Sequence, residues 1–399
     1  FFWRYISSCC RRKASCVPLW KTFVLGSLRK EGTMESFLKH YEVVLHTTGP
    51  VFVGSGKQLD KKEYILDRQK KEVSVFHLGK MYEGLEKRHL TDKFQQYLLG
   101  NEKILGRKML IEWFRDNRVS ETDYEPWLRY KVDCGDFMLQ KGTLAIAECV
   151  KNANDQPYIP GSSIKGMLRT ILLAYCAEKS NNKVLWKTQI SGGLDEKKQK
   201  RLLSSQKQMI ESDVFHLLQR KAVKTENAVN DIMSGFIVSD SDPVSVENLV
   251  LCQKIDVFLD GKQNDINILR ECIKPEIDIR FQLTIDSGIC PFVKDDIMQA
   301  IDYFGDQYYN RFLSKFSFSD YPKENEVWLG GGCGFATKTV LHSIFDERQA
   351  TKITSKILSK KKDSHNAKDV QLGVSPHVLK CTKYAGKMYQ FGKCELQLF

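Results

Sequence analysis

The alternation of side chains in residues 277–285 constrains the fold of this chain more than any other stretch. Successive side chains of an extended strand point to opposite faces, so this pattern predicts a strand with one buried face and one wet face. Half-buried strands are typical of antiparallel sheets. The expected buried set is Ile277, Ile279, Phe281, Leu283 and Ile285, and the exposed set is Asp278, Arg280, Gln282 and Thr284.

Strand and helix patterns occur elsewhere without a regular strand–helix repeat. Further strands are predicted at 41–48, 51–53, 236–239 and 249–252, and helices at 77–118 and 295–316. Because a doubly wound parallel sheet needs a regular alternation of strand and helix, we expect an α+β fold with antiparallel sheets. In the first helical stretch the expected core contacts are Met81, Leu85, Phe94, Tyr97, Leu98, Leu110, Trp113 and Phe114.

The chain is long enough, at 399 residues, for two domains with separate cores. We place the first domain at 34–235, with helical insertions that include the polar stretch 178–230, and the second at 236–399. The formal net charge of +12 favours a polyanionic partner.

Residues 1–33 differ from the rest of the chain. They hold seven basic side chains against one acidic side chain, together with three of the twelve cysteines. The stretch lacks the order of basic, apolar and small residues that marks a secretory signal peptide. Our hypothesis is that the native chain starts at Met34 and that 1–33 is a non-native or disordered basic extension.

The other nine cysteines show no CxxC pair and no zinc-like spacing with histidine. We therefore expect reduced thiols in or near cores, a cytoplasmic protein, and neither a metal nor a cofactor. No apolar run approaches the roughly 18 to 20 residues of a membrane-spanning helix, so no membrane association is expected.

Residues 158–173 combine a helix start with side chains that suit an anion. Ile164, Met167, Leu168, Ile171, Leu172 and Tyr175 form an apolar stripe at helical spacing. Ser162 or Ser163 is the expected N-cap, and Lys165 and Arg169 share the flank beside the stripe. Free amides, hydroxyls and cations at one place predict a phosphate site, with Gly161 and Gly166 allowing close approach. A capped helix with solvated cations remains the alternative.

A second glycine-rich segment is followed in the same way by hydroxyls, a lysine and apolar residues. It contains Gly330, Gly331, Gly332 and Gly334, then Lys338 and Thr339, then Val340, Leu341, Ile344 and Phe345. So many glycines point to close backbone contacts, and the repeated plan predicts contact with a sugar-phosphate backbone. A flexible turn is the alternative.

A third glycine stretch, Gly54-Ser55-Gly56 followed by Lys57, looks like a flexible loop after a strand. It resembles the end of a nucleotide-binding P-loop, but that motif needs a glycine at 51 and a hydroxyl at 58, where this chain has Val51 and Gln58. Residues 161–166 have the glycine spacing but not the lysine and hydroxyl that should follow. Neither stretch is a nucleotide-hydrolysis motif, and no small-molecule substrate is indicated.

The segments "IPGSSIKGMLRT" and "LGGGCGFATKT" resemble the two signature segments of the RAMP superfamily of CRISPR-associated proteins. Within it, "HTTGPVFVGSGKQLDKKEYI", "SGFIVSDS" and the order of segments are most similar to the family of fifth subunits of the type III-A Csm effector complex. The resemblance implies tandem ferredoxin-like, RRM-type domains with antiparallel sheets and helical insertions. Met167-Leu168 replaces the smaller Ala-Ile common in the family, and 1–33 has no counterpart.

The resemblance also implies a function. A chain of this family is a non-catalytic RNA-binding subunit that caps the backbone filament at the 3′ end of the CRISPR RNA and assists its maturation. Its expected partners are the CRISPR RNA, neighbouring Csm backbone RAMP subunits and host exonucleases that trim the guide. The expected RNA-binding residues are Gly161, Ser162, Ser163, Lys165, Arg169, Gly330, Gly331, Gly332, Gly334, Lys338, Thr339, His46 and Lys57. Lys352, Lys356, Lys360, Lys361, Lys362 and Lys368 are candidates to extend the basic track.

The sequence is also compatible with two other functions. Some RAMP relatives cut CRISPR precursors without metal by means of a histidine, and His46 is the candidate general acid or base. No second histidine or tyrosine is visibly paired with it in the sequence, so no catalytic residue is assigned. A purely structural subunit that touches no RNA is the third possibility, and its binding would be indifferent to salt.

Overall fold

The computed structural model describes residues 37–100, 108–137, 145–194, 204–220, 223–359 and 368–399. The hypothesis about residues 1–33 lies outside this part of the chain, as do Lys360, Lys361 and Lys362. Among the described helices, none combines the length and apolar character needed to cross a membrane.

Within the described residues the first sheet has five strands, all antiparallel, in the order β11-β14-β1-β10-β7. Val43 of β1 lies opposite Phe281 of β10. The predicted alternation is confirmed in β10, where the apolar side chains at 279, 281, 283 and 285 are buried and the polar ones at 278, 280 and 282 are exposed. The strands are β1 (Leu38–Thr47), β7 (Phe236–Val238), β10 (Asp278–Asp286), β11 (Glu326–Trp328) and β14 (Lys393–Leu398).

Helices pack against this sheet and form the largest core with it. The apolar stripe predicted for residues 164–175 is confirmed in α6, with Met167 and Tyr175 only partly buried. Trp186 of α7 is fully buried in the same core, so the polar stretch 178–230 contributes to it. These helices are α6 (Gly161–Glu178), α7 (Lys183–Gly193), α8 (Ser204–Phe215), α9 (Lys294–Arg311), α10 (Leu341–Ile344) and α11 (Glu347–Ser359), and the short α12 (Asp369–Leu372) lies against α11.

The second sheet is mixed. Most of its neighbours are antiparallel, but β5 runs parallel to β8 and β6 runs parallel to β9. Hydrogen-bonded neighbours follow the order β2-β6-β9-β8-β5-β4-β3, and β12 pairs with both β13 and β8. The strands are β2 (Gly54–Leu59), β3 (Tyr64–Asp67), β4 (Glu72–Phe76), β5 (Leu128–Asp133), β6 (Ile146–Cys149), β8 (Leu249–Phe258), β9 (Gln263–Ile273), β12 (Val378–Tyr384) and β13 (Lys387–Gln390).

The prediction of a flexible loop at Gly54–Gly56 is wrong. These residues begin β2, which pairs with β6 through a register shift between Gly54 and Gln58. A glycine inside a strand often marks such an irregularity, because without a Cβ the backbone can bend and twist locally.

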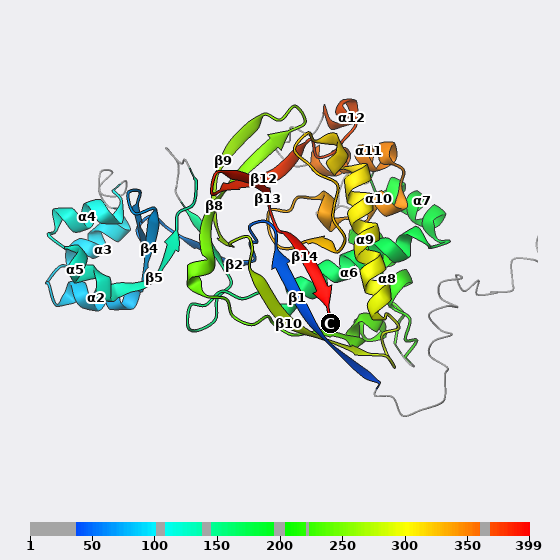
Figure 1. The fold of residues 1–399 in the computed structure, drawn as a ribbon, viewed down its shortest axis with the longest axis horizontal. Coiled ribbons are helices and arrows are strands. Elements are labelled where there is room, and N and C mark those ends of the chain that lie inside the picture. The colour runs from blue at the N-terminus through cyan, green and yellow to red at the C-terminus, as the bar shows by residue number, and fades with distance from the viewer. Residues whose placement is uncertain (1–36, 101–107, 138–144, 195–203, 221–222, 360–367) are drawn as a thin grey trace, which may run out of the picture.

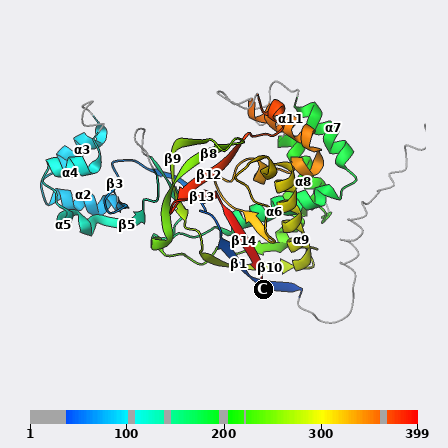
Figure 2. The same cartoon turned by 45° about the horizontal axis from the view of Figure 1, so that its top comes forward.

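Residues 78–100 and 108–127 form a helical lobe with its own aromatic core, and Figures 1 and 2 both show it apart from the other helices. Trp113 packs edge-on to Phe94 and stacks on Tyr97. The predicted core residues there are buried except Leu98, which is 45% exposed because it faces outward from its helix. The helices are α2 (Leu78–Glu86), α3 (Thr91–Leu99), α4 (Leu110–Asp116) and α5 (Glu121–Tyr124).

Both sheets take strands from either side of residue 235. In the first sheet β1 pairs with β10 and β14, and in the second β5 pairs with β8. The two halves of the chain are therefore interleaved through backbone hydrogen bonds. All nine cysteines of the described residues are buried and free, which confirms the expected placement in cores.

Candidate nucleic-acid interface

The helix start at residue 161 is closed by the protein itself. The N-cap is Pro160, so the prediction of Ser162 or Ser163 as the cap is wrong. The amide of Gly161 donates to the Asp240 carboxylate at 2.7 Å, and Ser163 and Ile164 donate to the carbonyl of Pro160. An internal carboxylate thus already satisfies the positive end of the helix dipole.

Two glycines of this helix have different physical roles. A Cβ on Gly161 would lie 2.4 Å from the carbonyl oxygen of Val238, so that glycine is required by the close approach of β7. A Cβ on Gly166 would meet nothing within 4 Å. The exposed backbone at Gly166 therefore faces open space.

The glycine-rich segment 330–334 packs closely on the start of the second sheet. Gly331 donates its amide to the carbonyl of Phe52 at 2.6 Å, and a Cβ on Gly330 would lie 2.2 Å from the same oxygen. A Cβ on Gly332 would be 3.1 Å from the Phe391 ring. These three glycines are explained by protein packing, whereas the nearest atom to a Cβ on Gly334 is 3.8 Å away on Lys380.

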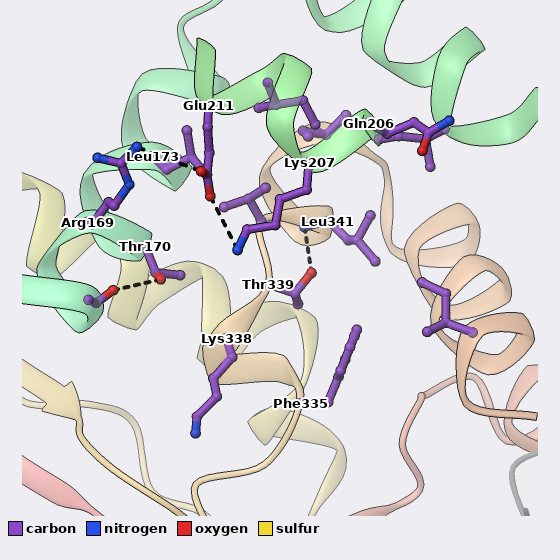
Figure 3. Close-up of a pocket in the computed structure, with 16 residues that line it drawn as sticks. Arg169, Thr170, Leu173, Gln206, Lys207, Glu211, Phe335, Lys338, Thr339 and Leu341 are labelled. Carbon is purple, nitrogen blue, oxygen red and sulfur yellow. Dashed lines mark hydrogen bonds and ion pairs between the residues drawn. The ribbon is translucent and has the colours of Figure 1, made fainter. Parts of the chain in front are cut away.

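The residues that follow the two glycine segments meet in one groove, which we call the α6–α10 groove. Its volume is about 450 Å³. Figure 3 shows Arg169 and Thr170 of α6 on one side, Lys207 and Glu211 of α8 above, and Lys338 and Thr339 below. The lining residues are Gly166, Arg169, Thr170, Leu173, Ile190, Gln206, Lys207, Ile210, Glu211, Phe335, Lys338, Thr339, Val340, Leu341, Ile344 and Ile357.

Arg169 is held in place by carboxylates rather than free in solvent. Its Nη1 contacts Asp231 at 2.7 Å and its Nη2 contacts Glu211 at 3.7 Å, while the guanidinium lies over the Phe215 ring. Glu211 also pairs with Lys207 at 3.4 Å, as the dashed lines in Figure 3 indicate. Arg169 is thus a fixed, partly neutralised cation at the edge of the groove.

Lys338 is the exposed cation of the opposite wall. It ends the short 3₁₀ helix η7 (Ala336–Lys338), and no carboxylate of the described residues forms an ion pair with it. Thr339 next to it accepts a hydrogen bond from the amide of Leu341 at 3.2 Å, which leaves its hydroxyl proton available. Three cations and one carboxylate line the groove and Asp231 beside Arg169 is a second carboxylate, so the groove keeps a net positive charge.

The other predicted RNA-binding residues lie outside the lining of the groove: Gly161, Ser162, Ser163, Lys165, Gly330, Gly331, Gly332, Gly334, His46 and Lys57. Ser162 is exposed, Ser163 is partly buried, and burial lowers the pKa of the partly buried Lys165. Lys57 lies on β2, exposed. Contact of these side chains with RNA remains a prediction.

His46 is paired with acids. On β1, its Nδ1 contacts Asp278 at 2.7 Å and its Nε2 contacts Glu276 at 3.4 Å. The hydrogen bond with Asp278 is the main cause that raises the pKa of His46. Both ring nitrogens of His46 thus lie against carboxylates, Asp278 and Glu276.

The contribution of α8 to the groove was not predicted from the sequence. Lys207, Gln206 and Glu211 line the groove, but they lie in a polar stretch with little helical periodicity. The available signal was the i, i+4 spacing of Lys207 and Glu211, which indicates only a helix face. No group of histidine, cysteine or acidic side chains among the described residues is arranged to hold a metal ion.

Comparisons with known proteins agree with this architecture. The model of the RAMP superfamily matches residues 44–373. The "CRISPR system Cms protein Csm5" of Mycobacterium tuberculosis is 26% identical over 92% of this chain and 99% of its own length, and that of Streptococcus thermophilus is 25% identical over 77% of this chain and 82% of its own.

Two solved structures share the fold. A chain of a Csm–crRNA–target RNA ternary complex from a type III-A CRISPR-Cas system, solved by cryo-EM, superposes with a TM-score of 0.60 at 18% identity, covering 90% of this chain and all of that one. The crystal structure of T. onnurineus Csm5 gives 0.56 at 16% identity, covering 88% of this chain and 99% of that one.

Proposed function

This chain belongs to the RAMP superfamily, and from that membership we propose that it is an RNA-binding subunit of a type III-A Csm effector complex in antiviral defence. Its relatives named Csm5 align over most of both chains, and one chain of the same fold belongs to a complex that contains crRNA. The proposed partners are a CRISPR RNA and neighbouring Csm subunits.

One observation carries the proposal for RNA. The two segments that resemble the family's signatures are more than 150 residues apart in the sequence, yet Gly166, Arg169, Lys338 and Thr339 line one positive groove. Beside its apolar lining the groove offers cations, hydroxyls and exposed backbone, with Phe335 as the single aromatic residue among the described residues of its wall, and these polar groups suit the sugar-phosphate strand. A guide-binding subunit needs contacts of this kind, because it must accept any spacer sequence.

We also propose a specific role for the subunit within the complex. The subunit caps the backbone filament at the 3′ end of the CRISPR RNA and assists maturation by positioning host exonucleases, without cutting RNA itself. The arrangement of His46 between Glu276 and Asp278 supports a non-catalytic role over a metal-independent endoribonuclease, because both ring nitrogens are engaged by carboxylates.

The test exploits the open space above Gly166. A leucine there fills the groove, while replacing a helical glycine removes a cost of about 1 kcal/mol, so the protein stays folded. Gln96→Leu is the control, since Gln96 is an exposed helical residue of α3 in the helical lobe and does not line the groove.

The measurement is the affinity of each purified variant for labelled CRISPR RNA over a range of salt. We expect Gly166→Leu to weaken binding about tenfold and Gln96→Leu to bind like the wild type. Equal affinities in two folded variants would contradict the groove as the RNA site. Cleavage of the RNA by the wild type, lost in His46→Ala, would support the endoribonuclease instead.

A further inference from the structure

A second basic cavity lies between α7 and α11. We call it the α7–α11 cavity, and its volume is about 680 Å³, within the range of roughly 300–1,000 Å³ in which ligand-sized groups bind. Its lining residues are Lys187, Thr188, Ser191, Leu194, Phe345, Gln349, Lys352, Ile353 and Lys356.

The charge of this cavity is of one sign. Three lysines line it, together with two hydroxyls and an amide, and none of the described lining residues is acidic. Lys352 and Lys356 are one turn apart on the same face of α11. Lys187 faces them from α7 with its ammonium 5.9 Å from the Phe345 ring. An anion between the two helices would contact ammonium groups from both, Lys187 from α7 and Lys352 from α11.

The cavity adjoins the α6–α10 groove along the same two helices. Ile190 of α7 and Ile357 of α11 line the groove, and Lys187, Ser191, Ile353 and Lys356, within one turn of them, line the cavity. A helix rises about 1.5 Å per residue, so the two linings are only a few ångströms apart along each axis.

We propose that the α7–α11 cavity is a second contact for the sugar-phosphate backbone of the same RNA strand that occupies the α6–α10 groove. This rests on the proposed function. The lysine ammoniums supply point charges for the phosphates, and Thr188, Ser191 and Gln349 supply hydrogen bonds to phosphate or ribose oxygens. The strand passes from the groove over the α7 and α11 edge into the cavity.

The variant for the test is Lys187→Gln with Lys352→Gln, because both residues keep long side chains and neither lines the groove. The matched control is Lys80→Gln with Lys93→Gln, which removes the same charge from exposed positions of the helical lobe. Thermal melting of both variants of the full chain checks that the fold is intact.

Two fluorescent oligouridylates serve as probes, one of about 6 nucleotides that fills only the groove and one of about 24 that reaches both sites. Log affinity falls with log salt, and each single-strand phosphate contact makes this slope steeper by about 0.7. Two lost contacts therefore make the slope shallower by about 1.4. Between about 1 M and 0.1 M salt this corresponds to an affinity roughly 25-fold lower for the long probe. We expect the short probe and the control variant to bind as the wild type does.

The outcomes separate the two proposals. If the wild type binds both probes and the Lys187/Lys352 variant binds the long one unchanged, the cavity is not an RNA contact and the groove proposal stands. If the wild type binds neither probe, the proposed function fails and this inference fails with it. Binding of poly-glutamate that is lost in the variant, with RNA affinity unchanged, would assign the cavity to an acidic protein segment and overturn the inference.

Discussion

The amide of Gly331 donates a hydrogen bond of 2.6 Å to the carbonyl of Phe52. This bond joins the glycine-rich segment to the residues that lead into β2, far away in the sequence. A Cβ on Gly331 would also lie 2.8 Å from the Phe52 ring. The glycines therefore anchor the segment on the protein, and the residues after it, at 335 and 338–341, are brought to the wall of the groove.

This packing predicts that Gly330→Ala is strongly destabilising. Gly330 has a φ of +89°, and its Cβ would meet the Phe52 carbonyl at 2.2 Å. The left-handed backbone and the overlap together predict a loss of about 3 kcal/mol in the free energy of unfolding, measured by chemical denaturation. Gly373→Ala is the control, with a φ of +73° and open space, and should lose about 1 kcal/mol. Similar losses in both variants would mean that the Phe52 contact is unimportant.

The buried pair of Lys151 and Glu271 joins the second sheet through a charged network. Glu271 is fully buried and also accepts hydrogen bonds from the Tyr130 hydroxyl at 2.7 Å and the Cys149 amide at 3.1 Å. Lys151→Met leaves the carboxylate without its cation, so we expect a loss of about 3–5 kcal/mol in the free energy of unfolding. In Lys151→Met with Glu271→Gln the loss should be smaller than in Lys151→Met. An equal or larger loss in the double variant would show that the two charges are not coupled.

His342 predicts a loss of stability in acid. Burial lowers the pKa of His342 to about 4, and neither ring nitrogen has a hydrogen-bond partner in the described structure. The folded state thus holds the neutral form, while the unfolded chain takes up a proton near its ordinary pKa of 6.5. The stabilisation that follows from keeping His342 neutral is fully present above pH 6.5. As the pH falls from 6.5 to 4, the free energy of unfolding decreases by about 3 kcal/mol.

The measurement compares the free energy of unfolding of the wild type and of His342→Leu across that range. We expect the difference between them to change with pH in favour of the variant as the solution becomes acidic. A difference that does not vary with pH would show that His342 is protonated equally in both states.

The ion pair of Arg169 with Asp231 predicts a variant that binds RNA more tightly. Asp231→Asn removes the carboxylate at 2.7 Å but keeps the side-chain oxygen that accepts from the Met233 amide at 2.8 Å. Arg169, left with Glu211 alone, becomes available to one phosphate. We expect the RNA affinity to rise about fivefold near 0.1 M salt and the salt slope to steepen by about 0.7. If Asp231→Asn binds RNA like the wild type and Arg169→Gln causes no loss of RNA affinity, Arg169 is not part of the RNA interface.

Local patterns were sufficient to predict the elements that present one apolar face. The alternation at 279–285 and the helical stripe of α6 each hold a set of side chains that must leave water together, and their period is set by backbone geometry alone. The resemblance of the two glycine-bearing segments to family signatures was also readable from their residues, and the match over 44–373 agrees with it.

The tertiary structure decided which groups remain free for a ligand. The amide of Gly161 is satisfied by Asp240, the cation of Arg169 by Asp231, and the ring of His46 by Asp278, and each partner lies more than 60 residues away in the sequence. No local pattern specifies such pairs, because a charge or an amide is neutralised by whatever the fold brings to it. For the same reason the groove lies over Gly166, one turn beyond the predicted helix start, where no backbone or side chain covers the helix.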